Sequence, residues 1–119
     1  MFSKLIEFPD GSRYYGQVNG DIPHGMGSLW YKDGSRYEGE YENGMQSGNG
    51  MFFWADGTHY VGDFKNNAMT GYGATYYVNG NKYEGEFQNG KRHGKGTMTE
   101  ADGKTKTGQW TNGEFEDKK

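Results

Sequence analysis

A turn dipeptide recurs along this chain at a constant interval of 23 residues. It appears five times, as Asp10-Gly11, Asp33-Gly34, Asp56-Gly57, Asn79-Gly80 and Asp102-Gly103. Self-similarity with a fixed period of this length is typical of repeat proteins, in which each unit packs mainly against its neighbours. We therefore predict a row of equivalent side chains rather than an ordinary packed domain with one pocket.

Each repeat begins with a segment in which large apolar residues alternate with polar ones. An aromatic residue, a glycine and a second large residue occupy every other position, as in Tyr37, Gly39 and Tyr41. A period of two places these residues on one face of a β-strand and the intervening polar residues on the other. The leading aromatic column contains Tyr14, Tyr37, Tyr60 and Tyr83, with Lys106 in the last copy.

A second strand follows in each repeat, where paired glycines such as Gly48 and Gly50 precede an aromatic run such as 52–54. Aromatic runs of this kind favour strands, so each repeat is predicted to be a β-hairpin. The Asp-Gly pairs would join successive hairpins, and pairs such as Asn43-Gly44 would form a left-handed corner inside each one. The predicted fold is all-β, a single elongated and twisted antiparallel sheet of consecutive hairpins.

The period divides the chain into one repeat domain of about five units. An N-terminal half-unit, residues 1–10, closes one edge of the sheet. Four complete units follow, at 11–33, 34–56, 57–79 and 80–102. A partial unit without a second strand covers 103–115, and we expect the tail, 116–119, to be disordered.

The composition limits how such a chain can be stabilised and what it can bind. There is no cysteine, and only 31% of the residues are hydrophobic, so stability must come from aromatic side chains stacked across strands over glycines. The net charge of −3 opposes general attraction to nucleic acid or anionic membranes. No apolar segment is long enough to span a membrane and no signal peptide is visible, which favours a cytoplasmic location.

No catalytic or metal-binding arrangement emerges from the sequence. His24 and His93 fall in equivalent loops three repeats apart, too far to share a metal ion, and His59 lies in another column. The carboxylates Glu38, Glu40, Glu84 and Glu86 form an acidic stripe on the solvated face rather than a pair in a dry pocket. We therefore predict no metal, no cofactor and no enzymatic activity.

Two segments carry the fullest version of the repeat. They are Tyr37-Glu38-Gly39-Glu40-Tyr41-Glu42-Asn43-Gly44 with Gly48-Asn49-Gly50, and Tyr83-Glu84-Gly85-Glu86-Phe87-Gln88-Asn89-Gly90 with Gly94-Lys95-Gly96. The pattern resembles the MORN repeat (membrane occupation and recognition nexus) and extends from about Phe8 to Phe115. The resemblance implies an elongated antiparallel sheet, and a role in binding proteins or lipids rather than catalysis.

The aromatic rows are the main candidates for function, although packing within the sheet is the simpler reading of them. A single sheet has no second layer, so we expect part of the row to stay open and a protein or peptide segment to lie along it. The candidate residues are Tyr37, Tyr60, Tyr83, Trp54 and Tyr77, with Trp30, Phe53 and Tyr76 if the opposite face is used. A homodimer, in which two sheets cover each other, is a variant of the same hypothesis.

Two other classes of function stay open. Anionic phospholipids, phosphoinositides in particular, could be bound through Arg13, Arg36, Lys82, Lys91, Arg92 and Lys95. The basic column shares its face with acidic residues, however, so local cross-strand ion pairs explain it more simply. Choline- or carbohydrate-binding repeats also combine aromatic hairpins with glycine-rich turns, but the glutamate-rich strands and the missing secretion signal argue against them.

Overall fold

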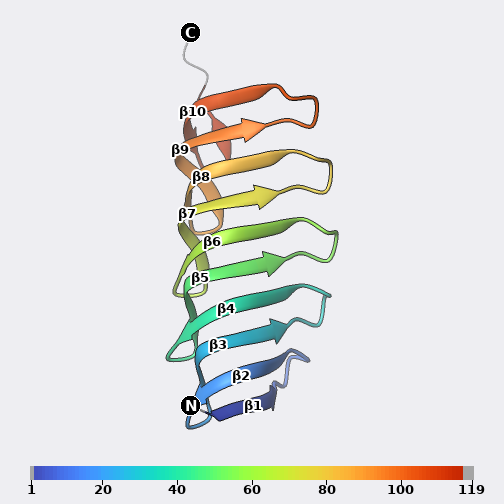
Figure 1. The fold of residues 1–119 in the computed structure, drawn as a ribbon, viewed down its shortest axis with the longest axis vertical. Helices are drawn as coiled ribbons and strands as arrows, with labels where there is room; N and C mark the ends of the chain where they lie inside the picture. The colour runs from blue at the N-terminus through green and yellow to red at the C-terminus, as the bar shows by residue number, and fades with distance from the viewer. Residues whose placement is uncertain (1, 117–119) are drawn as a thin grey trace.

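The computed structural model describes residues 2–116, which form eleven β-strands and their connecting turns. The strands are β1 (Phe2–Glu7), β2 (Arg13–Asn19), β3 (Ile22–Trp30), β4 (Arg36–Glu42), β5 (Met45–Phe53), β6 (His59–Lys65), β7 (Ala68–Tyr76), β8 (Lys82–Gln88), β9 (Lys91–Thr99), β10 (Thr105–Thr111) and β11 (Glu114–Phe115). Each strand pairs with the next in sequence, so that one antiparallel sheet runs from β1 to β11 along the long axis (Figure 1). The predicted fold class is confirmed.

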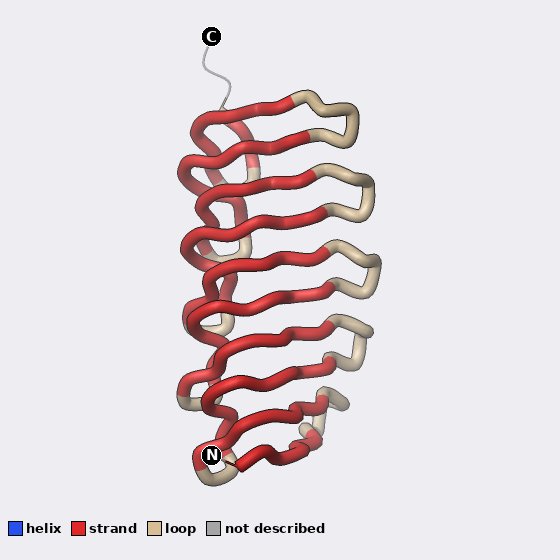
Figure 2. The backbone as a smooth tube through the Cα atoms, viewed as in Figure 1, coloured by secondary structure: helices blue, strands red, loops and turns tan. Residues whose placement is uncertain are grey.

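Each hairpin is bent near its middle. In the pair of β4 and β5, the register shifts between Gly39 and Tyr41, opposite Gly50 and Gln46. An irregularity of this kind, a β-bulge, bends the strand and increases its twist. The same shift recurs in the pairs β2–β3, β6–β7 and β8–β9. The hairpin ends therefore curl back behind the strands, as Figure 2 shows, and the sheet partly covers itself.

The core is a ladder of aromatic rings inside this bend. Tyr41 meets Tyr14 and Tyr37 edge-on, with ring centroids 5.1 and 5.2 Å apart. The same T-shaped contact continues through every later repeat as far as Trp110. Each such pair stabilises the fold by about 0.5–1.5 kcal/mol beyond the burial of its surface.

Four tyrosines of this ladder, Tyr14, Tyr37, Tyr60 and Tyr83, lie over paired glycines and are completely buried. The Tyr37 hydroxyl donates to the Glu40 carbonyl at 2.7 Å, and a Cβ atom placed on Gly50 would lie 2.6 Å from the hydroxyl oxygen. Tyr60 and Tyr83 repeat this arrangement, and all three have 0% of their surface exposed. The prediction that part of this row stays open is therefore wrong for these tyrosines, because the curled hairpin ends cover them.

The Asp-Gly turns between hairpins share one geometry. The Gly34 amide donates to the Tyr31 carbonyl at 3.2 Å, and the Tyr31 amide donates to the Ser35 carbonyl at 2.9 Å. Gly34 has a φ of 95°, and the Asp33 Oδ1 atom accepts a hydrogen bond from the Ser35 amide at 2.8 Å. A three-residue loop with glycine in the left-handed region is a common hairpin connection. The predicted turn positions are confirmed.

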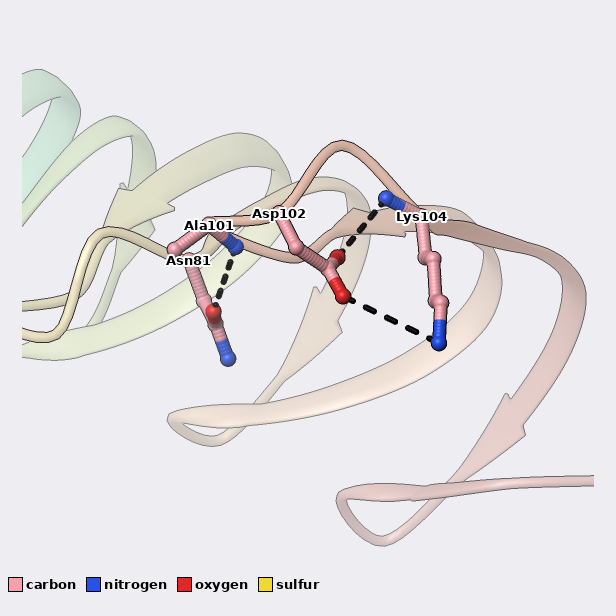
Figure 3. Close-up of polar contacts among 4 residues, drawn as sticks. All are labelled: Asn81, Ala101, Asp102 and Lys104. Carbon is pink, nitrogen blue, oxygen red and sulfur yellow. Dashed lines mark hydrogen bonds and ion pairs between the residues drawn. The ribbon is translucent and has the colours of Figure 1, made fainter.

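Neighbouring turns are also joined to each other. In Figure 3, the Asp102 Oδ1 atom accepts from the Lys104 amide at 3.0 Å, as in the other turns. The Asn81 Oδ1 atom, from the turn before, accepts from the Ala101 amide at 3.0 Å. Side-chain hydrogen bonds therefore link neighbouring turns along the long axis, in addition to the backbone hydrogen bonds between the strands.

The corners inside the hairpins also have the predicted backbone. Asn43 and Gly44 have φ values of 51° and 86°, as a two-residue type I′ turn requires. In the first corner Gly20 has a positive φ but Asp21 does not, which marks the departure of that copy from the others. Each corner is bonded to the one before it, and the first such bond runs from the Gly44 amide to the Pro23 carbonyl at 2.9 Å.

The two ends of the sheet differ from the middle. β1 pairs with β2 along its whole length, from Phe2 opposite Val18 to Glu7 opposite Arg13. At the other end, β11 pairs with β10 through two residues, so the last unit keeps a remnant of the second strand that the sequence predicted to be missing. The expected disordered tail lies outside the described residues, except for Glu116.

The turn geometry gives a first testable prediction. Asp33→Ala should lower the free energy of unfolding by about 1 kcal/mol, because the Ser35 amide loses its hydrogen-bond acceptor. Asp33→Asn is the matched control, since Asn79 already occupies this column and accepts from the Asn81 amide at 3.0 Å. Urea denaturation measures both variants, and an equal loss in the two would contradict a stabilising role for this bond.

Candidate functional site

A groove runs along the inner side of the bent sheet between two rows of side chains. One row follows the Asp-Gly turns, and we call it the aromatic row: Phe8, Tyr31, Trp54 and Tyr77. The other follows the hairpin corners, and we call it the corner row: Pro23, Gln46, Met69 and Arg92. Both rows have the 23-residue period of the chain.

The groove consists of three adjoining cavities with volumes of about 560, 260 and 470 Å³ from the N-terminal to the C-terminal end. Each cavity is lined by two successive members of the aromatic row and two of the corner row. The middle cavity shares Tyr31 and Gln46 with the first, and Trp54 and Met69 with the third. The three cavities therefore lie in a row across four repeats, and we call this row the inner groove.

Hydrogen bonds join the two rows across the groove. The Gln46 Nε2 atom donates to the Tyr31 hydroxyl at 2.8 Å, and the Arg92 Nη1 atom donates to the Tyr77 hydroxyl at 2.8 Å. Both hydroxyls act as acceptors in these bonds, so the proton of each is available for another acceptor. Burial raises the pKa of Tyr31, which keeps its hydroxyl protonated at neutral pH. Within residues 2–116, the Trp54 Nε1 atom has no hydrogen-bond partner and is not buried.

Charge is confined to the two ends of the groove. Asp10 lines the first cavity, whereas Asp56, Lys91 and Arg92 line the third. No charged residue lines the middle cavity among the described residues. Arg92 also lies over the Trp110 ring, with its guanidinium carbon 5.1 Å from the ring centroid, and donates to the Gly113 carbonyl. The centre of the groove therefore suits an uncharged ligand segment.

Comparison with known proteins identifies the repeat. The model of the MORN repeat family matches four consecutive segments, residues 14–36, 37–59, 60–82 and 83–105, which make up most of the chain. The chain belongs to the MORN repeat family. Each of the first three MORN units contributes one member to the aromatic row and one to the corner row. The comparison with curated proteins found no match.

The solved structures that resemble this MORN protein include the following two. The first is the SAS-4 (dCPAP) TCP domain of Drosophila melanogaster in complex with a proline-rich motif of Ana2 (dSTIL), with a TM-score of 0.60 and 16% identity over 88% of this chain. The second is the TCP10 domain of Danio rerio CPAP in complex with a peptide of Danio rerio STIL, with a TM-score of 0.37 and 14% identity, also over 88%. This chain spans 57% and 53% of those two chains. The first likeness shows a shared fold.

The structure distributes the predicted partner-binding residues over three places. Trp54 and Tyr77 are half-buried and line the inner groove. Tyr37, Tyr60 and Tyr83 lie in the core and have no surface to offer a partner. The remaining three, Trp30, Phe53 and Tyr76, lie on the outer face, as alternation along the second strand predicted. The groove thus includes only two of the eight candidates.

The outer face of the MORN array carries a stack of its own. The Arg36 guanidinium carbon lies 4.4 Å from the Phe53 ring centroid, and His59 stacks between Phe53 and Tyr76 with centroid distances of 5.8 and 4.9 Å. The Lys82 ammonium nitrogen lies 5.2 Å from the Tyr76 centroid. Side chains from β4 to β8 therefore pack on one another across this face.

The basic residues considered for lipid binding are not gathered in one patch. Arg36 and Lys82 form ion pairs with Glu38 and Glu84, at 3.5 and 2.9 Å, within the same strand rather than across strands as predicted. Arg92 points into the inner groove, whereas Arg13, Lys91 and Lys95 are exposed. The described residues form no helix that could cross a membrane.

The histidines and acidic residues have structural partners. The His24 Nδ1 atom accepts a hydrogen bond from the Asn43 amide at 3.2 Å. The His93 Nδ1 atom accepts the equivalent bond from the Asn112 amide at 3.3 Å. The Glu40 carboxylate accepts from the Asn49 amide at 2.5 Å, opposite the bulge. Within residues 2–116, no three His, Cys, Asp or Glu side chains come together as metal ligands would.

The corner row was not recognised from the sequence, although one member, Arg92, was considered for lipid binding. Its members differ in chemistry, so no shared residue type marks the column, although each follows its partner in the aromatic row by the same interval. Phe8 and Tyr31 are separated by one 23-residue period, but neither is among the predicted binding residues. The signal that could have found the corner row is the 23-residue period, if it is applied to every position of the repeat and not only to the aromatic ones.

Proposed function

We propose that this MORN protein is a non-enzymatic interaction module that binds an extended segment of a partner protein along the inner groove. The observation that carries this proposal is the row of three adjoining, similarly lined cavities across four repeats. Half-buried aromatic rings with polar tips, bordered by polar side chains, are the typical lining of peptide-binding grooves.

The comparison with solved structures supports a peptide ligand. The SAS-4 TCP domain, which shares the fold, was solved with a proline-rich motif of another protein. A long groove with an uncharged centre also favours a segment that touches several repeats over a small molecule that fills one cavity. Contacts with several repeats at once would give specificity for a particular partner segment.

Replacement of Trp54 tests the proposal. Peptides selected from a random display library against the wild-type protein should bind the Trp54→Ala variant about 30-fold more weakly, because a central aromatic anchor contributes about 2 kcal/mol. Isothermal titration calorimetry measures the two affinities. Trp30→Ala, on the outer face, is the matched control and should leave the affinity unchanged.

Circular dichroism must show that both variants are folded, since Trp54 also packs against Phe52, with ring centroids 4.9 Å apart. Selected peptides that lose affinity for Trp30→Ala but not for Trp54→Ala would place the binding site on the outer face and refute the proposal. A selection that enriches no peptide dependent on Trp54 would also refute it.

A further inference from the structure

We propose that the segment bound in the inner groove is a polyproline II helix with proline, or another apolar residue, at every third position. This inference rests on the proposed function and deepens it, because it specifies the conformation and the side-chain period of the ligand. It follows from the spacing of the groove, the lining of its cavities and the hydrogen-bond donors of the aromatic row.

The spacing of the repeats matches one turn of a polyproline II helix. Each repeat advances the sheet by two strands, or about 9.6 Å, since neighbouring strands lie about 4.8 Å apart. A polyproline II helix has three residues per turn and rises about 3.1 Å per residue, or about 9.3 Å per turn. The two periods differ by about 0.3 Å, so a ligand would stay in register within about 1 Å over the whole groove.

The other regular conformations do not match this spacing. In a β-strand, residues on one face recur about every 6.7 Å, so successive side chains would meet different parts of the repeat. In an α-helix, residue i+7 returns to the same face after about 10.5 Å, so the helix would slip by about 0.9 Å with each repeat, about three times the mismatch of the polyproline II helix. The polyproline II helix is therefore the regular conformation that presents the same face to every repeat.

The lining of the cavities suits apolar side chains at this period. Residues i, i+3 and i+6 of the ligand would occupy the first, middle and third cavities. The middle cavity contains the rings of Phe52 and Trp54 and the Met69 side chain, and no charged residue lines it among those described. A charged residue at position i+3 would lose its hydration there without gaining an ion pair, whereas a proline ring would pack against the aromatic rings.

The aromatic row also offers hydrogen-bond donors at the same period. A polyproline II helix forms no internal hydrogen bonds, so its carbonyl groups need donors from solvent or from a protein. The Tyr31 hydroxyl, the Trp54 Nε1 atom and the Tyr77 hydroxyl supply one donor in each of three successive repeats. Each turn of the ligand could therefore place one carbonyl group near one of these donors.

Peptide length gives the first test. Capped oligoprolines of about four, seven and ten residues span one, two and three turns of the helix. Four residues reach two cavities and seven reach all three, so affinity should rise from the first peptide to the second by roughly fivefold or more and change little with the third. Chemical-shift titration by NMR measures such weak binding, and an affinity that rises by the same factor at each step would contradict the match with three cavities.

Peptide period gives the second test. A capped heptapeptide with proline at positions 1, 4 and 7 and serine elsewhere should bind more tightly than one with proline at positions 1, 3, 5 and 7, although the second contains more proline. The first fills all three cavities with proline, and the second fills two at most. Trp54→Phe keeps an aromatic ring, although a smaller one, and removes the Nε1 donor; it should weaken the first peptide roughly threefold to tenfold.

The outcomes separate this inference from the proposed function. If library-selected peptides depend on Trp54 but show no three-residue period, or if the second heptapeptide binds as tightly as the first, the polyproline II inference is wrong and groove binding stands. If neither the selected peptides nor the proline peptides depend on Trp54, both are wrong. Selected peptides with proline at i, i+3 and i+6 that also depend on Trp54 would support both.

Discussion

Replacing Gly50 with alanine should lower the free energy of unfolding by about 3 kcal/mol or more, although it adds a single methyl group. The new Cβ atom would lie 2.6 Å from the Tyr37 hydroxyl oxygen and 2.7 Å from the Cε1 atom of its ring. The ring cannot move aside easily, because it is held by the Glu40 carbonyl and packs edge-on against Phe64 at 4.9 Å. The methyl group therefore forces the backbone of two strands apart.

Thermal unfolding followed by circular dichroism measures this effect, and a loss of about 3 kcal/mol should lower Tm by at least about 10 °C. Met51→Ala, at the next position of β5, is the control and should cost less than half as much because Met51 points away from the ladder. Adding Tyr37→Leu to Gly50→Ala should cost less than the sum of the single changes, since the clash is relieved. Additive losses would show that Gly50 and Tyr37 do not interact as described.

Alkaline pH should unfold the protein in one cooperative step, well above neutral pH. Burial raises the pKa of Tyr37, Tyr41 and Tyr60 above the ordinary value of 10, and that of Tyr83 to about 12. A raised pKa in the folded state means that the stability these groups contribute is fully present below pH 10 and is lost as the pH rises through the folded-state values. Each buried tyrosine lowers the free energy of unfolding by up to about 1.4 kcal/mol per pH unit in this range.

Four such groups together should exhaust a stability of about 5–15 kcal/mol within a few pH units above 10. We expect phenolate absorbance from the buried tyrosines and loss of the β-sheet signal in circular dichroism to appear at the same pH. Tyr83→Phe removes one titrating group and should make the pH dependence shallower by up to about 1.4 kcal/mol per unit. Ionisation of the ladder tyrosines in a still-folded protein would refute the prediction.

The sequence was sufficient to predict the hairpins, their order and both kinds of turn. These features depend on local chemistry: Gly34 and Asn43 stand where the backbone is left-handed, and aromatic residues alternate with polar ones along β4. The burial of Tyr37 could not be predicted in the same way. It depends on the register shift opposite Gly50 and Gln46, which bends the sheet over itself and has no marker of its own in the alternation of residues.

The inner groove was only half predictable for a related reason. Trp54 and Tyr77 attracted attention because they are aromatic, but their partners Met69 and Arg92 come from a different strand and face them only after the bend. A search for residue types finds two aromatic members of the first row, and it finds Arg92 of the second row only as a basic residue. Side chains that are chemically unlike can line one groove when the backbone returns to the same place every 23 residues.

Backbone hydrogen bonds join successive corners, such as those from the Gly44 amide to the Pro23 carbonyl and from the Gly90 amide to the Met69 carbonyl. They hold the corner row at the same interval that the strand ladder imposes on the aromatic row. The backbone therefore fixes the spacing of the side chains on both sides of the groove. A change in the distance between repeats would break the hydrogen bonds between strands and those between corners at the same time. A family member with one more repeat would therefore have a longer groove in which the side chains keep the same spacing.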